Sequence, residues 1–142
     1  MQDPRQSPPA SPTVRAAGSG VRLQQQVDAT REALREVRST LRELLESSGF
    51  SPRFVAAALD VTHELLVNAH QHGAPPVELT VAVGAADMRV AVSDHSTDPA
   101  RVLPYRAGVS ERGLGVRLVR QLSRDWGQDL DDHGKVVWAR II

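Results

Sequence analysis

With 142 residues, the chain is long enough for one domain and too short for two. Lys and Arg together number 17, as do Asp and Glu, so no net charge favours nucleic acid or an anionic membrane. Cysteine is absent, which excludes disulfides, thiolate zinc sites and a cysteine nucleophile and suits a reducing cytoplasm. No apolar run approaches the roughly 20 residues needed to span a bilayer. We therefore expect a cytoplasmic protein that binds neither nucleic acid nor a membrane.

The N-terminal segment differs in composition from the rest of the chain. MQDPRQSPPASPTVRAAGSG is rich in Pro, Ser and Gly and lacks the apolar core of a signal peptide. A segment without a large apolar cluster cannot offset the entropy cost of folding. The composition predicts a disordered tail over residues 1–19 and one folded domain over residues 20–142.

Two helices are predicted next. Residues 21–25 read as a short edge strand, and residues 27–46 carry an apolar stripe opposite a charged face, which is typical of an amphipathic helix. Gly49 ends that helix. Ser51 is a good N-cap with Pro52 behind it, and the second helix runs to about His72.

Beyond Gly73, which follows the second helix as its C′ residue, the hydrophobic period changes to that of strands. The predicted strands are residues 77–83, 88–94, 126–130 and 135–142. Residues 95–112 are a loop, and GLGVRLVRQLSRD (113–125) predicts a third helix. This order predicts an α+β fold: a two-layer α/β sandwich in which helices pack on one face of a mixed, mostly antiparallel sheet.

The stretch HELLVNAHQHG (63–73) carries the first candidate site. Glu64 and Asn68 lie roughly 40° apart on the helix, on the arc opposite its apolar side. A carboxylate and a carboxamide one turn apart can present two oxygen ligands to a hard cation such as Mg²⁺, or to a polarised water. A solvated polar face is the alternative.

Three downstream features accompany this pair. Asp94 ends a strand that the sequence predicts to be buried, where a charged side chain is unexpected without a structural or functional role. In ERGLG (111–115), Gly113 and Gly115 stand at a helix start, where backbone N–H groups can face an anion. DHGK (132–135) turns tightly before the final strand. Each feature is weak alone, but their order is specific.

At these positions the sequence resembles a known family. ELLVN followed by AHQHG looks like the N box of the gyrase and histidine-kinase-type (GHKL) ATPases, which share the Bergerat ATP-binding fold. VSD (92–94) resembles the start of the G1 box, ERGLGVRLV the G2 box, and HGKVVWARI the final G3 strand. The stand-alone form is most similar to anti-sigma-factor serine/threonine kinases. The resemblance covers about residues 21–142.

The resemblance implies ATP and Mg²⁺ as cofactors and roles for particular residues. It implies that Asn68 coordinates the Mg²⁺ that bridges the phosphates, and that Glu64 is the base or orienter for the attacking hydroxyl or water. It implies that Asp94 accepts a hydrogen bond from the adenine amino group.

The resemblance also implies that the glycines of G2, Gly113 and Gly115 with Leu114 between them, let backbone approach the phosphates. Arg112 is the candidate for stabilising phosphate charge. His72 closes the N box and is a candidate for lining the nucleotide site, although stabilisation by the helix C-terminus explains it equally well.

The sequence departs from the family pattern at two boxes. Ser96 and Asp98 stand where the G1 box has glycines, and Val136 stands in place of the usual G3 Thr. Both departures predict weakened nucleotide binding. A zinc site is disfavoured because no third ligand joins the histidines, and Trp126 and Trp138 are expected in the core.

Two functions follow from the resemblance. The first is an anti-sigma-factor-type protein serine/threonine kinase that phosphorylates a small antagonist protein and binds a sigma factor. The second is a non-catalytic or weakly nucleotide-binding interaction module with the same fold. Because the Arg-rich face of the first helix is interleaved with Glu, it predicts a solvated face, with a partner surface or homodimer interface as the alternative.

Overall fold

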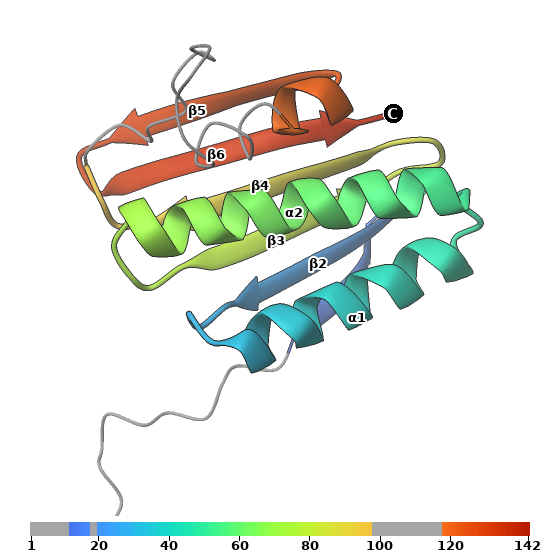
Figure 1. Ribbon diagram of the computed structural model, residues 1–142, viewed down its shortest axis with the longest axis horizontal. Helices are drawn as coiled ribbons and strands as arrows, with labels where there is room; N and C mark the ends of the chain where they lie inside the picture. The colour runs from blue at the N-terminus through green and yellow to red at the C-terminus, as the bar shows by residue number, and fades with distance from the viewer. Residues whose placement is uncertain (1–11, 18–19, 98–117) are drawn as a thin grey trace, which may run out of the picture.

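The computed structural model describes residues 12–17, 20–97 and 118–142. They form a layer of helices on one face of an open sheet (Figure 1). The helices are α1 (Arg31–Ser47) and α2 (Pro52–His72), with a further helical stretch at residues 118–122. The strands are β1 (Thr13–Ala17), β2 (Gly20–Gln26), β3 (Glu78–Val83), β4 (Met88–Asp94), β5 (Asp125–Asp131) and β6 (Gly134–Ile141). None of the helices within these described ranges is long and apolar enough to cross a membrane.

The sheet has the order β1-β2-β3-β4-β6-β5, and each neighbouring pair is antiparallel. This confirms the predicted α+β fold, although the described strands form a wholly antiparallel sheet rather than a mixed one. The reason lies between β2 and β3. A single crossover helix would give parallel strands, whereas α1 and α2 form a helical hairpin that returns the chain to the end it left (Figure 1).

Local capping signals set the helix ends. The Thr30 hydroxyl accepts a hydrogen bond from the Ala33 N–H at 3.1 Å, so α1 begins four residues after the predicted start at Val27. Val27 itself lies outside the helix and donates its N–H to the Val77 carbonyl at 2.9 Å. At α2, the Ser51 hydroxyl accepts from the Phe54 N–H at 3.2 Å, which confirms the predicted cap.

The prediction for the N-terminal segment is wrong for residues 13–17. They form β1, which pairs along β2 with Val14 opposite Leu23. Thr13 and Val14 are β-branched and suit a strand, and pairing supplies the hydrogen bonds that composition alone does not reveal. Because β1 is the edge strand, the second prediction, that residues 21–25 form an edge, is also wrong.

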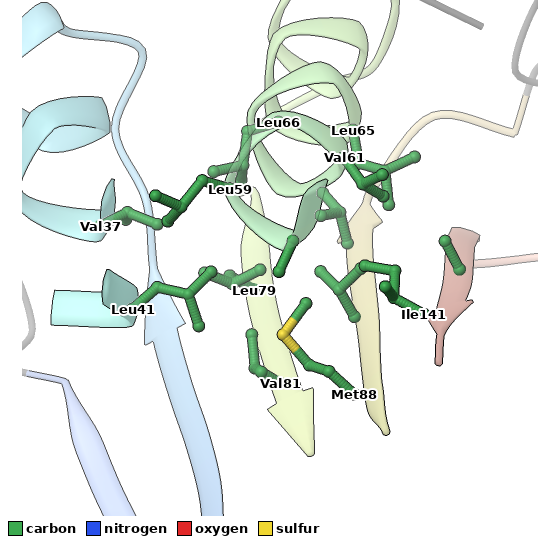
Figure 2. Close-up of a cluster of buried hydrophobic side chains, with 14 of the residues drawn as sticks. Val37, Leu41, Leu59, Val61, Leu65, Leu66, Leu79, Val81, Met88 and Ile141 are labelled. Carbon is green, nitrogen blue, oxygen red and sulfur yellow. The ribbon is translucent and has the colours of Figure 1, made fainter. Parts of the chain in front are cut away.

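The core lies between the helices and the sheet (Figure 2). Its labelled side chains come from both layers: Val37, Leu41, Leu59, Val61, Leu65, Leu66, Leu79, Val81, Met88 and Ile141. Trp126 packs against this cluster, as predicted. Trp138 does not belong to it. Its ring is half-buried on the opposite face of the sheet, with the Arg89 guanidinium 5.2 Å from the ring centroid.

Candidate functional site

Glu64 and Asn68 occupy the side of α2 that faces away from α1. Leu66 lines the seam between the two helices, and a residue two positions away lies about 160° around the helix from it. Both polar side chains are half-buried. Within the described ranges, neither has a hydrogen-bond or ion-pair partner, so both keep their oxygens available for a ligand.

The donor set of this pair fits a phosphate-bound Mg²⁺. Magnesium is usually held in proteins by one or two side chains together with substrate phosphates and waters. In the described part of the chain, no three His, Cys, Asp or Glu side chains gather to hold a metal ion by themselves. An Asn–Glu pair therefore suits a metal that arrives with a nucleotide better than a resident ion.

Asp94 ends β4 beneath the C-terminus of α2, and its carboxylate is fully engaged. Its Oδ1 accepts hydrogen bonds from the Ser96 N–H at 2.7 Å and the Ala74 N–H at 3.3 Å. Its Oδ2 lies 3.5 Å from the Lys135 Nζ, and the two side chains are only 1% and 2% exposed. The acid at the strand end is thus half of a buried ion pair.

Two glycines allow this packing. A Cβ at Gly73 would lie 2.5 Å from both the Cγ and the Oδ2 of Asp94. Gly73 has an extended backbone with φ −95°, so glycine is required there by the close contact with Asp94 and not by the left-handed conformation expected of a C′ glycine. On the other side, Gly134 has φ +156°, and a Cβ there would overlap the Asp94 carbonyl oxygen.

Lys135 is the site residue that sequence reasoning missed. The G3 departure was assigned to Val136, but Val136 pairs with Ser93 and lies on the sheet face away from the helices. Lys135 pairs with Asp94 and shares the helix-side face with Val137, Ala139 and Ile141, which are buried. The alternation of these apolar residues was a usable signal, because it places every odd-numbered residue of the strand on the core face.

The remaining predicted site residues are only partly placed. His72 is the last residue of α2 and is half-buried, so its role stays a prediction. The Nε2 of His70, two residues earlier in α2, forms a 3.0 Å hydrogen bond with the Val27 carbonyl. Arg112, Gly113, Leu114 and Gly115 lie outside the described residues, as does Asp98.

A family model described as the histidine kinase-like ATPase domain matches residues 27–141. The chain belongs to the histidine kinase-like ATPases. No curated protein matches its sequence.

Two solved structures share the fold of this histidine kinase-like ATPase domain. The RsbU and RsbW domains of Rv1364c from Mycobacterium tuberculosis match with a TM-score of 0.63 and 22% identity over 84% of this chain. The histidine kinase domain of the blue-light activated histidine kinase EL346 from Erythrobacter litoralis matches with a TM-score of 0.50 and 18% identity over 89% of this chain. The chain corresponds to 32% of the mycobacterial structure and 69% of the Erythrobacter one.

The motif resemblance predicts two ends of the candidate site, a phosphate end at Glu64 and Asn68 and a base end at Asp94. Within the described residues, Glu64 and Asn68 have no partner, and their oxygens suit a nucleotide-bound Mg²⁺. Asp94 is paired with Lys135 and does not present a free carboxylate edge. The family assignment implies ATP binding.

Proposed function

We propose that the chain is an ATP-binding regulatory protein of the anti-sigma-factor kinase type, which transfers a phosphoryl group to a serine or threonine of a small antagonist protein and binds a sigma factor. The observation that carries the proposal is the Glu64/Asn68 pair on α2, which has no hydrogen-bond or ion-pair partner among the residues that the structure describes. The family assignment and the motif resemblance to anti-sigma-factor kinases support it. Cytoplasmic location and the option of a homodimer belong to the same proposal.

The roles of the two residues follow from their chemistry. The Asn68 side-chain oxygen is a neutral ligand suited to the metal, and Mg²⁺–ATP supplies the phosphoryl group and neutralises charge when bound. Glu64 lies one turn earlier, where its carboxylate orients the attacking hydroxyl and accepts its proton. His72, Arg112 and the segment Gly113–Gly115 are proposed to complete the phosphate end.

A non-catalytic interaction module is the second candidate function. The buried pair between Asp94 and Lys135 favours it, because an occupied carboxylate lowers the affinity of the base end for adenine. The two functions differ in whether ATP binds and whether its phosphoryl group is transferred, and two variants separate these questions.

The first test is calorimetric titration with ATP and Mg²⁺, carried to millimolar ATP. Asn68→Ala should weaken binding by about tenfold or more, since the variant loses the proposed metal ligand. Its stability should change little because Asn68 is only half-buried. His63→Ala is the matched control: His63 is exposed on the same helix, about 140° around from Asn68. Equal affinities for Asn68→Ala and the control would remove the site assignment.

The second test separates catalysis from binding. Glu64→Gln is nearly isosteric and should keep ATP affinity while lowering phosphoryl transfer by about 10²–10⁴-fold, the usual contribution of a general base. Transfer is measured with radiolabelled ATP and a serine-containing antagonist protein. Equal rates for the wild type and the variant would refute the role of Glu64 and leave ATP binding unaffected.

A further inference from the structure

The base end of the site is closed by a residue of the chain itself. The two backbone N–H groups of Ala74 and Ser96 occupy the Oδ1 of Asp94, and the Lys135 ammonium approaches the Oδ2. Gly73 lies directly against the same carboxylate and leaves no space above it. No edge of Asp94 is therefore presented to a ligand.

This arrangement has a consequence for recognition of a base. An exocyclic amino group is a neutral donor, whereas Lys135 carries a full positive charge, and its attraction to the Asp94 carboxylate at 3.5 Å is weakly screened because both side chains are buried. Separating Asp94 from Lys135 would also leave two charges in a poorly solvated site, which is costly. A purine amino group thus competes with an internal ligand that is stronger than itself.

We propose that Lys135 is the affinity-determining residue of the base pocket: its ammonium takes the place of the base amino group on Asp94, and a nucleotide binds only when Lys135 withdraws. The inference rests on the proposed function, because it concerns the same nucleotide site.

The fold holds Lys135 in this position. Asp94 and Lys135 face each other directly in the β4–β6 register, so both side chains emerge on the helix side of the sheet. Gly134 packs against the Asp94 backbone and fixes the distance between the two strands at that point. Lys135 is also the only lysine of the chain, so its amine can be followed by itself chemically.

The first experiment is titration of Lys135→Met with ATP and Mg²⁺, after circular dichroism has shown that the variant is folded. Met preserves the length of the side chain and removes the charge, so ATP should bind at least about tenfold more tightly than to the wild type. Arg140→Met is the matched control, because Arg140 lies on the same strand but on the opposite face and should bind ATP as the wild type does.

The outcomes separate this inference from the proposed function. Measurable ATP binding that is equal in Lys135→Met and the wild type, or weaker in the variant, overturns the role of Lys135 and leaves the proposed function standing. Weaker binding would mean that Lys135 contacts the base. If the folded variant and the wild type both fail to bind ATP at millimolar concentration, the proposed function falls and the inference with it.

The second experiment uses the wild-type protein and does not depend on folding of a variant. An N-hydroxysuccinimide acetate reagent modifies the N-terminal amine and Lys135, and intact-mass spectrometry counts the acetyl groups. We expect Lys135 to react at least about tenfold more slowly in the native protein than in guanidinium chloride, because it is buried against Asp94, and faster once ATP and Mg²⁺ are bound. Equal rates in the native and unfolded protein, or bound ATP that leaves the rate unchanged, would overturn the inference.

Discussion

Gly134 is the position where a single added methyl group should disturb both the fold and the base end of the site. It opens β6 after a turn in which the Asp131 carboxylate accepts hydrogen bonds from the N–H groups of His133 and Gly134, at 2.7 and 3.0 Å. Its φ of +156° is a backbone conformation that side chains other than glycine rarely adopt. A Cβ there would overlap the Asp94 carbonyl oxygen and lie 3.1 Å from the His95 Cα.

The expected cost of Gly134→Ala has two parts. Holding an L-residue in a sparsely populated backbone region costs about 1–3 kcal/mol. Forcing atoms into a close-packed region costs another 1–3 kcal/mol or so, and here the obstacle is backbone, which cannot rotate away. The variant should therefore lose about 2–6 kcal/mol of unfolding free energy, a large share of the roughly 5–15 kcal/mol typical of a native domain.

Guanidinium chloride unfolding, followed by circular dichroism, measures this loss. Gly49→Ala is the matched control: Gly49 has φ +85°, but no atom lies within 4 Å of its added Cβ. That variant should show only the conformational cost, about 1–2 kcal/mol. If Gly134→Ala loses no more than Gly49→Ala, the contact between Gly134 and Asp94 does not constrain the strands, and the reasoning is refuted.

Two further substitutions test the core and the start of α2 by the same unfolding measurement. Leu41→Ala should lose about 2–5 kcal/mol of unfolding free energy, because Leu41 is 0% exposed between α1 and the sheet. Leu130→Ala, at a 43% exposed position, should change it by less than about 0.5 kcal/mol. Similar losses in both variants would contradict the assigned core. Ser51→Ala should lose about 0.5–2 kcal/mol, since the Phe54 N–H loses its acceptor, and Ser51→Asp should retain most of the stability because Asp also caps helices. An unchanged stability in Ser51→Ala would show that the cap contributes nothing.

The elements predicted best are those whose signals are local. The second helix has its N-cap, its first-turn proline and its final glycine within the helix and one residue on either side, and the structure places α2 at Pro52–His72 as predicted. The β3 and β4 hairpin also followed from alternation and a short connection, which closes through the Gly84 N–H and the Asp87 carbonyl at 2.9 Å.

The failures share a different cause, which is long-range pairing. β1 is stabilised by the neighbouring strand and not by its own apolar residues, as the 53% exposure of Val14 shows, so its composition resembles that of a tail. Val136, where the sequence lacks the usual G3 Thr, lies on the sheet face away from the helices, one residue from Lys135 on the helix side. In a strand, a shift of one residue moves the side chain to the other face of the sheet.

Asp94 illustrates how far the candidate site could be predicted. The sequence indicated that an acid at the end of a buried strand has a structural or functional role, and the structure shows it paired with Lys135. The identity of the partner depends on the register between β4 and β6, which no local pattern encodes. The Glu64/Asn68 pair needed only helical spacing, so the placement of both side chains on one side of α2 could be predicted.

The insertion of β6 between β4 and β5 has a consequence for folding kinetics. β3 with β4 and β5 with β6 form local hairpins, so each of these pairings has low contact order and can form early. The pairing of β4 with β6 must instead close the whole connection between Asp94 and Lys135, and the pairing of β2 with β3 spans both helices. We expect the β4–β6 pairing to be absent from the transition state. Destabilising substitutions confined to that pairing should then accelerate unfolding and leave the folding rate nearly unchanged.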